Sequence, residues 1–231
     1  MPSVLVTGAN RGLGLEFVRQ YAEAGWRVYA CCRKPEQAQA LNELAAGTQA
    51  VSVHPLDVGN HGQIDAMAGT LGDEPLDVLL NNAGTYGGRE HQSLGNLDYD
   101  AWVDTFRINA MGPVRMVERL LGNLERSQRR LVVTITSLMG SIEDNTSGGS
   151  YLYRTSKAAL NAAMKSVALD VAPRGVHVLL LHPGWVRTDM GGPNALITPQ
   201  ESVRAIRQRV ETFTPDLSGD FLNYDGHEYP W

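Results

Sequence analysis

The chain has 231 residues, of which 43% are hydrophobic and 19% are charged, and its formal net charge is −5. This length suits one large domain, and the composition is that of a soluble globular protein. The negative charge argues against nucleic acid as the main partner, because phosphate backbones attract clustered lysine and arginine. The sequence contains no signal-peptide pattern and no apolar run of membrane-spanning length. We therefore expect one cytoplasmic domain over residues 1–231, with no membrane or nucleic-acid partner.

Short apolar runs alternate with longer helical patterns along the chain. The predicted strands are residues 4–6, 28–30, 51–53, 78–80, 131–135 and 176–181, with a last one near 221–222. The predicted helices are residues 13–24, 36–45, 62–71, 100–124, 153–172 and 199–212. Continuous apolar strands in a repeating strand–helix order indicate a parallel sheet covered on both faces. The expected fold is α/β, a doubly wound Rossmann-type sheet of about seven strands in the order 3-2-1-4-5-6-7.

The chain has two cysteines, the neighbours Cys31 and Cys32. Neighbouring residues of a strand point to opposite faces, so the pair is poorly placed for an ordinary disulfide. We expect both to be reduced and half-buried, which suits a cytoplasmic protein.

A glycine-rich turn joins the first predicted strand to the first predicted helix. Gly8 permits a tight turn, Gly12 lets the backbone approach a pyrophosphate, and Gly14 lets helix and strand pack closely. Amides at the start of a helix also attract phosphate. An ordinary glycine-rich turn would look similar, but the position at the opening of a βαβ unit favours a dinucleotide site. The cofactor-binding residues expected here are Gly8, Asn10, Arg11, Gly12, Leu13 and Gly14.

The spacing Gly-x-x-x-Gly-x-Gly resembles the opening of the short-chain dehydrogenase/reductase family. Other motifs of that family follow in order: Asn81-Asn82-Ala83-Gly84, Asn109, Ser137, Tyr153-x-x-x-Lys157 and Pro183-Gly184-Trp185-Val186-Arg187-Thr188. The resemblance implies that Asp57 and Val58 border the adenine, that Asn82, Ala83 and Gly84 back the ribose, and that Pro183, Gly184, Val186 and Thr188 lie at the nicotinamide.

The end of the second predicted strand favours NADP over NAD. An acidic residue there usually accepts the ribose hydroxyls of NAD, whereas a nearby arginine accommodates the 2′-phosphate of NADP. Here Arg33 follows the strand and the first acid is Glu36. Arg11 in the glycine turn is a second candidate for the same phosphate, since an arginine fork matches phosphate geometry. The alternative is that both are solvated surface cations.

Tyr153 and Lys157 form a candidate acid–base pair. Their spacing of four places both on one face of a helix. A free tyrosine has a pKa near ~10, and the charges of a lysine and of oxidised nicotinamide would both favour its phenolate. Ser137, just past the fifth strand, can hydrogen-bond the same substrate oxygen. A solvated helix face is the alternative for an isolated Tyr/Lys pair.

Two neighbouring residues are weaker candidates. Tyr151 has a threonine four residues later, and Ser141 does not match the family's Ser-x-x-Gly. The resemblance implies that Ser137 orients and polarises a carbonyl, that Tyr153 is the general acid/base, and that Lys157 lowers the pKa of Tyr153 and binds ribose hydroxyls.

Asn109 lies inside a helical segment, four residues before Pro113. Proline has no N–H, so it cannot bond the carbonyl of Asn109, which is left to bind another group. In the family the corresponding asparagine holds a water that links to the active lysine. A proline kink without chemistry is the alternative, and the two interpretations are compatible.

The segment around Tyr153 and the C-terminal tail are similar to the C-factor-like and sniffer-like carbonyl reductases. Nine residues separate Thr188 from Thr198, so the substrate lid is short, which predicts an open pocket with loose specificity. Loops at the carboxyl ends of the strands form such pockets. The candidate walls, each of which has local loop packing as an alternative, are Tyr86, Leu138, Met139, Ile142 and Trp185.

Two functions fit these residues. The first is an enzyme that reduces a small carbonyl (an aldehyde, a ketone, an α-dicarbonyl or a quinone) with NADPH, reversibly. The second is a nucleotide sensor or signalling protein on the same fold, which would not need Tyr153 beside Lys157. No metal site is expected. Small residues in the predicted helix 153–172 would also allow a homodimer or homotetramer.

Overall fold

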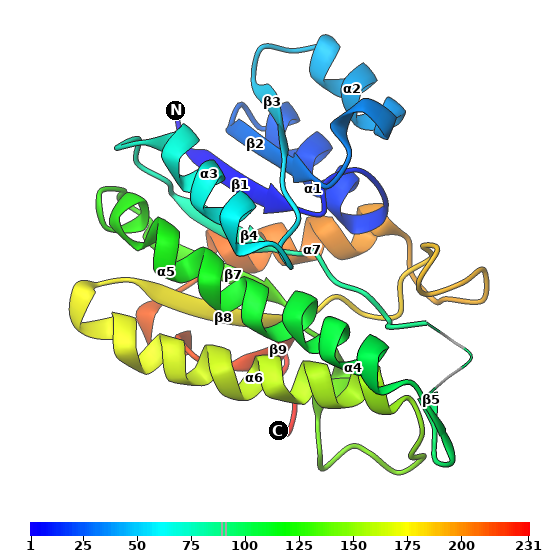
Figure 1. Cartoon of the computed structure of the whole chain (residues 1–231). Coiled ribbons are helices and arrows are strands. Elements are labelled where there is room, and N and C mark those ends of the chain that lie inside the picture. Colours follow the sequence, from blue (N-terminus) through cyan, green and yellow to red (C-terminus); the bar gives the residue numbers. More distant parts are fainter. Residues whose placement is uncertain (89, 91) are drawn as a thin grey trace.

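The computed structural model describes residues 1–88, 90 and 92–231. Seven strands form one parallel sheet in the order β3-β2-β1-β4-β7-β8-β9 (Figure 1). They are β1 Ser3–Thr7, β2 Arg27–Cys32, β3 Val51–Pro55, β4 Val78–Asn81, β7 Leu131–Ile135, β8 His177–His182 and β9 Phe221–Asn223. The predicted doubly wound order is confirmed. A small antiparallel hairpin, β5 Gln92–Ser93 with β6 Asn96–Leu97, is not predicted from the sequence.

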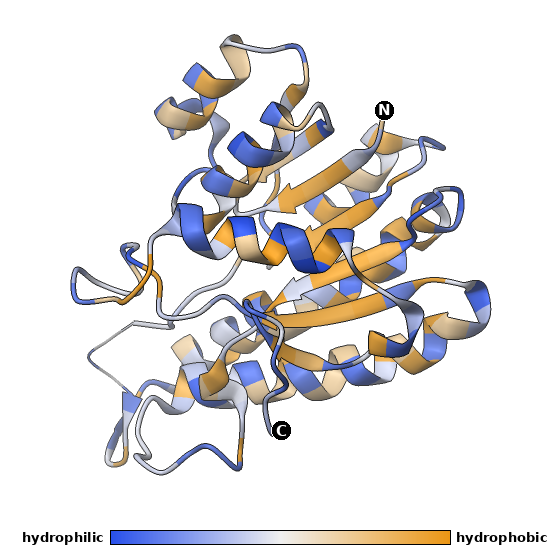
Figure 2. Cartoon of the chain, turned by 180° about the vertical axis from the view of Figure 1, so that it is seen from behind, coloured by the Kyte–Doolittle hydropathy of each residue, from blue (hydrophilic) through white to orange (hydrophobic). Residues whose placement is uncertain are grey.

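Helices cover both faces of the sheet (Figure 1). One face packs against α1 Gly12–Glu23, α2 Gln39–Ala46 and α7 Pro199–Glu211, and the other against α3 His61–Leu71, α5 Gly112–Glu125 and α6 Tyr151–Val171. The strands are apolar along their length, whereas the helices alternate between apolar and polar residues (Figure 2). Each helix therefore buries one apolar stripe on the sheet. The order of strands reverses between β1 and β4, where ligands bind in open α/β sheets.

The long helix predicted at 100–124 is interrupted. It consists of α4 Tyr99–Phe106, a π-helical turn Arg107–Met111, and α5. The N–H of Gly112 donates to the carbonyl of Arg107, five residues back, and the register shift immediately precedes Pro113. A Cβ on Gly112 would lie 2.6 Å from the carbonyl oxygen of Val58, so glycine lets this helix approach the β3–α3 turn.

Both cysteines are buried and free, so the expectation of half-burial is wrong. Each face of β2 is covered: Cys31 packs in the core beneath α3, and Cys32 in the core beneath α1 and α2. A central position in a doubly covered parallel sheet leaves neither thiol at the surface.

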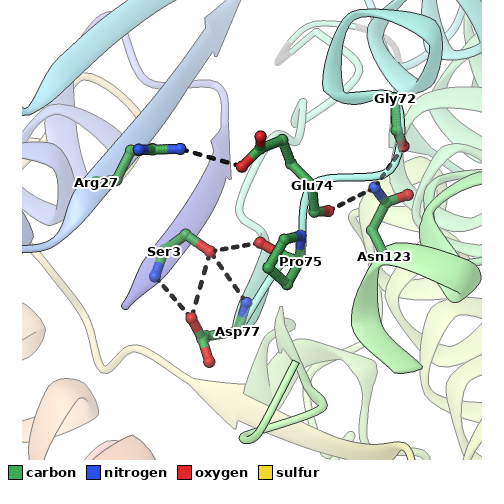
Figure 3. Close-up of polar contacts among 7 residues, drawn as sticks. All are labelled: Ser3, Arg27, Gly72, Glu74, Pro75, Asp77 and Asn123. Atoms are coloured by element: carbon green, nitrogen blue, oxygen red, sulfur yellow. Dashed lines mark hydrogen bonds and ion pairs between the residues drawn. The ribbon is translucent and has the colours of Figure 1, made fainter. Parts of the chain in front are cut away.

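A polar network joins the amino ends of β1 and β4 (Figure 3). The N–H of Ser3 donates to Asp77 Oδ2 at 2.9 Å, the hydroxyl of Ser3 donates to the carbonyl of Pro75 at 3.0 Å, and the N–H of Asp77 donates to that hydroxyl at 3.2 Å. Nearby, Asn123 Nδ2 at the end of α5 donates to the carbonyls of Gly72 and Glu74. These bonds hold the turn after α3 against β1 and α5.

Candidate active site

The glycine turn brings α1 against the carboxyl end of β1. A Cβ on Gly14 would lie 2.0 Å from the carbonyl oxygen of Gly8, and Gly8 itself has φ +69°. Both positions therefore require glycine, the first for packing and the second for backbone conformation. This agrees with the roles predicted for them. The helix begins at Gly12, so its first amides face the cleft beside the turn.

Asn82 and Thr7 tie the glycine turn to β4. The hydroxyl of Thr7 accepts from the N–H groups of Asn82 and Ala83, at 3.0 and 2.9 Å. Asn82 Nδ2 donates to the carbonyls of Thr7 and Gly8, at 2.8 and 3.3 Å. Asn82 thus holds the two strand ends that flank the reversal of strand order. The role of Thr7 is not predicted from the sequence, where it stands only as the residue before the first glycine.

A cleft of about 740 Å³ runs from the glycine turn to Tyr153. Most of the predicted nucleotide-binding residues line this one cleft. Arg33 lies at one end, and the pair Tyr153 and Lys157 lies at the other. Gly184 and Val186 belong to the adjoining loop but not to the lining. The predicted residues that line the cleft are Gly8, Asn10, Arg11, Gly12, Leu13, Gly14, Arg33, Asp57, Val58, Asn82, Ala83, Gly84, Tyr153, Lys157, Pro183 and Thr188.

Hydrogen bonds within local turns fix the positions of polar groups along the cleft. Asp57 Oδ1 accepts from the N–H of Gly59 at 2.9 Å, and the N–H of Asp57 donates to Gln63 Oε1 at 2.7 Å. The hydroxyl of Thr188 accepts from the N–H of Gly191 at 3.2 Å. The loop after β8 is therefore folded back on itself next to Gly12, whose added Cβ would contact Thr188 Cγ2 at 3.3 Å.

The two arginines predicted to share a phosphate lie differently. Arg33 is exposed at the rim of the cleft and makes no ion pair with any residue that the structure describes. Arg11 forms an ion pair with Asp189 of the loop after β8, and both side chains are exposed. Arg33 is therefore the side chain directly available to a phosphate, whereas Arg11 bridges the two loops that border the cleft.

Tyr153 and Lys157 line the inner end of the cleft, and Ser137 hydrogen-bonds Tyr153 without lining the cleft itself. Tyr153 and Lys157 lie on α6, and Ser137 follows β7, so the parallel strand ends and the covering helix bring them together. All three are buried, at 7%, 8% and 4% exposure. Lys157 Nζ donates to the carbonyl of Ile135 at 3.0 Å and lies 5.9 Å from the centre of the Tyr153 ring.

Burial dominates the acid–base properties of this pair. It raises the pKa of Tyr153 to about 12, against the opposing effect of a hydrogen bond from Ser137. It lowers the pKa of Lys157 to about 8. The predicted lowering of the Tyr153 pKa by Lys157 is not seen in this structure, because the phenol is desolvated and the ammonium group is directed to Ile135. The result is a neutral phenol, the form that can donate a proton.

Asn109 is fully buried and joins the cleft floor to α6. Its Oδ1 accepts from the N–H of Thr85 at 2.8 Å, and its Nδ2 donates to the Thr85 carbonyl at 2.8 Å and to Ser156 Oγ at 2.9 Å. The predicted free carbonyl lies in the π-helical turn before Pro113. The side chain thus locks the loop after β4 to the helix that carries Lys157.

Two further residues position Tyr153 and are not predicted as such from the sequence. The Tyr86 ring stacks on the Tyr153 ring with centres 4.7 Å apart, and its hydroxyl hydrogen-bonds Ser150 at 2.7 Å. Buried Gln92 accepts from the N–H of Tyr153 at 3.2 Å and donates to the carbonyl of Tyr86. A lone glutamine in a polar segment carries no signal that would predict this contact.

Only one of the five residues predicted to form the substrate pocket lines the cleft. Tyr86 lines the cleft, whereas Leu138, Met139, Ile142 and Trp185 do not. Ile142 is 78% exposed, and its N–H donates to the carbonyl of Trp231. Trp185 is half exposed, and its Nε1 donates to the carbonyl of Gly191. Met190, which was not predicted, does line the cleft.

Among the described residues, no group of three or more histidine, cysteine or acidic side chains is placed to hold a metal ion. Within the same part of the chain, no helix has the length and apolar character needed to cross a membrane.

The sequence and fold match known proteins over most or all of their length. The short chain dehydrogenase family model matches residues 2–196. The chain is 47% identical to "C-signal" of Myxococcus xanthus over 157 residues, 68% of this chain and 93% of that protein. Its fold matches carbonyl reductase Sniffer of D. melanogaster with a TM-score of 0.93 and 34% identity, covering both chains completely. An NADPH-bound carbonyl reductase from chicken fatty liver matches with a TM-score of 0.93 and 32% identity, over 100% of this chain and 99% of that one.

The chain belongs to the short-chain dehydrogenase family and is an oxidoreductase by class. Within that family it resembles the C-factor-like and sniffer-like branch, as the sequence motifs predict.

Proposed function

We propose that this protein is an NADP(H)-dependent carbonyl reductase that converts an aldehyde or ketone to an alcohol, reversibly. The observation that carries the proposal is one cleft with the glycine turn and Arg33 at one end and buried Tyr153 at the other. The NADPH bound by the chicken reductase and the carbonyl reductase activity in the names of similar structures support it.

The cofactor supplies a hydride to the carbonyl carbon, and the protein supplies the proton and the geometry. Ser137 holds the carbonyl oxygen beside Tyr153, whose neutral phenol donates the proton. Lys157 stabilises the phenolate that remains and returns a proton to it, for which a pKa of about 8 is well matched. In reverse, the phenolate accepts the alcohol proton.

The proposed substrates are small carbonyls that bind beside stacked aromatic rings. Tyr86 covers one face of Tyr153, and the exposed side chain of Met190 also lines the cleft. Aromatic and branched aldehydes, α-dicarbonyls and quinones fit this mixture of one polar anchor and apolar walls.

The test is turnover of NADPH and NADH against a panel of aldehydes, ketones, α-dicarbonyls and quinones. Tyr153→Phe keeps the ring and removes the proton donor, so we expect at least a roughly 100-fold loss of kcat with unchanged NADPH binding. Tyr151→Phe, two residues earlier on the same helix, is the matched control and should keep its activity. Tight NADPH binding without turnover across the panel would favour a nucleotide sensor, the competing function.

We also propose that residues 1–231 act as one domain in the cytoplasm, as a homodimer or homotetramer. The small residues Ala158, Ala159, Ala162 and Ala163 along α6 would allow close helix approach. Light scattering on the purified protein measures the oligomeric state directly.

A further inference from the structure

A row of polar side chains crosses the carboxyl end of the sheet on the face that packs against α6. Thr134 lies on β7 and Thr136 directly follows that strand, and His182 and Asn223 are register partners on β8 and β9. The backbone N–H of Thr136 donates to the carbonyl of Leu181, which places Thr136 beside His182. Residues two apart on a strand share a face, so these side chains all point toward α6. There, Asn161 Oδ1 accepts from Thr136 Oγ1 at 2.5 Å.

This row concentrates buried polar atoms that lack a hydrogen-bond partner among the described residues. Eleven such atoms occur in that part of the chain, and six of them are the Tyr21 hydroxyl and arginine nitrogens. The other five lie in or beside this row: Asn81 Oδ1, Thr134 Oγ1, Asn161 Nδ2, His182 Nδ1 and Asn223 Oδ1.

An unpaired buried polar atom costs about 1–3 kcal/mol, so five on one face call for a common explanation. Both donors and acceptors are present, and ordered water satisfies such groups in protein interiors. The row lies next to Lys157, which precedes Asn161 by one helical turn. Water held by these side chains would therefore lie close to the Lys157 ammonium group.

His182 stands where this row meets the surface. Its Nδ1 is sealed from solvent while the ring as a whole is partly exposed. The Tyr229 ring lies 5.6 Å from it, and His227, paired with Asp225 at 2.7 Å, packs edge-on against Tyr229. The charged and titratable groups that face His182 are thus Lys157 from α6 and Tyr229 and His227 from the C-terminal segment, with Asp225 behind His227.

Burial lowers the pKa of His182 to about 4, and the charges of Lys157 and His227 act in the same direction. The ring is therefore neutral at pH 7. A neutral imidazole has one N–H donor and one acceptor nitrogen, so it can take a proton on one side and release one on the other.

We infer that His182 relays protons from the surface of the C-terminal segment to Lys157 through water held by Asn161, Thr134 and Asn223. The inference rests on the proposed function. In each turnover the substrate oxygen takes a proton from Tyr153, the phenolate takes one from Lys157, and the neutral amine takes one from the relay. One solvent proton is consumed for each carbonyl reduced, and His182 ends each cycle neutral.

The kinetic test is His182→Phe, measured with NADPH in H₂O and D₂O between pH 6 and 9. We expect kcat to fall roughly tenfold and its solvent isotope effect to rise, with the KM for NADPH unchanged. His182→Gln guards against a folding defect and should show the same isotope effect. His177→Phe, on the same strand at the other end of the sheet, is the matched control. Wild-type kcat and isotope effect in both His182 variants would overturn the inference.

A second measurement does not depend on turnover. In ¹⁵N NMR spectra of the histidine side chains, His182 should still be mostly neutral at pH 5 in the wild type, because its pKa is about 4. Its pKa should rise in Lys157→Met, because a neighbouring positive charge is removed. A His182 signal that is indifferent to Lys157→Met overturns the inference. Absence of wild-type turnover would instead refute the proposed function, and the NMR titration would still decide whether His182 and Lys157 are coupled.

Discussion

The two ends of the central sheet differ in how their buried polar groups are bonded. At the amino end, Ser3 and Asp77 bond each other and Asn123 bonds two carbonyls, so polar groups serve as ties between elements (Figure 3). At the carboxyl end, the sheet carries buried polar atoms beside Lys157, and among the described residues neither these atoms have a hydrogen-bond partner nor Lys157 a carboxylate. The first arrangement stabilises the fold, whereas the second keeps polar groups available for protons and ligands at a cost in stability. Substitutions at the two ends should therefore change different measurements.

The largest effect is expected at the glycine turn. In Gly14→Ala the added Cβ would overlap the carbonyl of Gly8, so α1 must move away from β1. A misplacement of about 1 Å costs catalysis roughly 100-fold, and we expect a loss of similar size in binding, measured by fluorescence titration as a rise in the Kd for NADPH. Gly69→Ala in α3, where a Cβ meets no atom within 4 Å, is the control and should leave binding unchanged. Equal binding by both variants would contradict the assignment of the turn.

Asn123→Ala should instead reduce stability alone. It leaves the carbonyls of Gly72 and Glu74 without their donor, and we expect the free energy of unfolding in urea to fall by about 2 kcal/mol. The kcat and KM should stay at wild-type values because the site lies at the other end of the sheet. Exposed Asn42, which donates to a single carbonyl, provides the control Asn42→Ala with a smaller loss. A change in kcat in Asn123→Ala would contradict the proposal that the amino end of the sheet serves stability alone.

Arg33→Ala should weaken the binding of NADPH but not that of NADH. A charge-assisted bond to phosphate is worth enough to raise the Kd for NADPH by about tenfold, while the Kd for NADH stays the same. Lys34→Ala tests whether any nearby positive charge has this effect, since Lys34 is exposed but does not line the cleft. Equal losses for NADPH and NADH in Arg33→Ala would mean that Arg33 does not read the 2′-phosphate.

Lys157→Met should abolish activity yet stabilise the fold at pH 7, by about 1 kcal/mol, because it removes a buried charge. Burial lowers the pKa of Lys157 to about 8. Between pH 8 and the ordinary lysine value near ~10.4, the unfolded chain binds more protons at this residue, so wild-type stability should gain as pH rises. Urea unfolding at pH 7 and pH 9.5 measures both effects. A Lys157→Met variant that is less stable than wild type at pH 7 would contradict this account. So would a variant whose free energy of unfolding still rises between pH 7 and pH 9.5 as much as that of the wild type.

Much of this protein could be predicted from local sequence. The order of strands, the covering helices and the glycine turn follow from periodicity and from the few residues that can adopt a tight turn or pack at backbone distance. Tyr153 and Lys157 could be paired because helical spacing alone places them on one face.

Other features depend on residues that are far apart in the chain. The half-burial expected for Cys32 is wrong because α1 and α2 cover it, and four of the five predicted substrate walls lie outside the cleft because loop directions are set by distant contacts. The contact of Gln92 with Tyr153, and the row formed by Thr136, His182 and Asn223, arise where strands and helices from different parts of the chain meet. The sequence by itself thus determined the class of fold and the chemistry of its motifs, since both rest on spacing. Only the tertiary structure decided the desolvation that raises the pKa of Tyr153 and lowers that of Lys157, because burial depends on every element packed around a group.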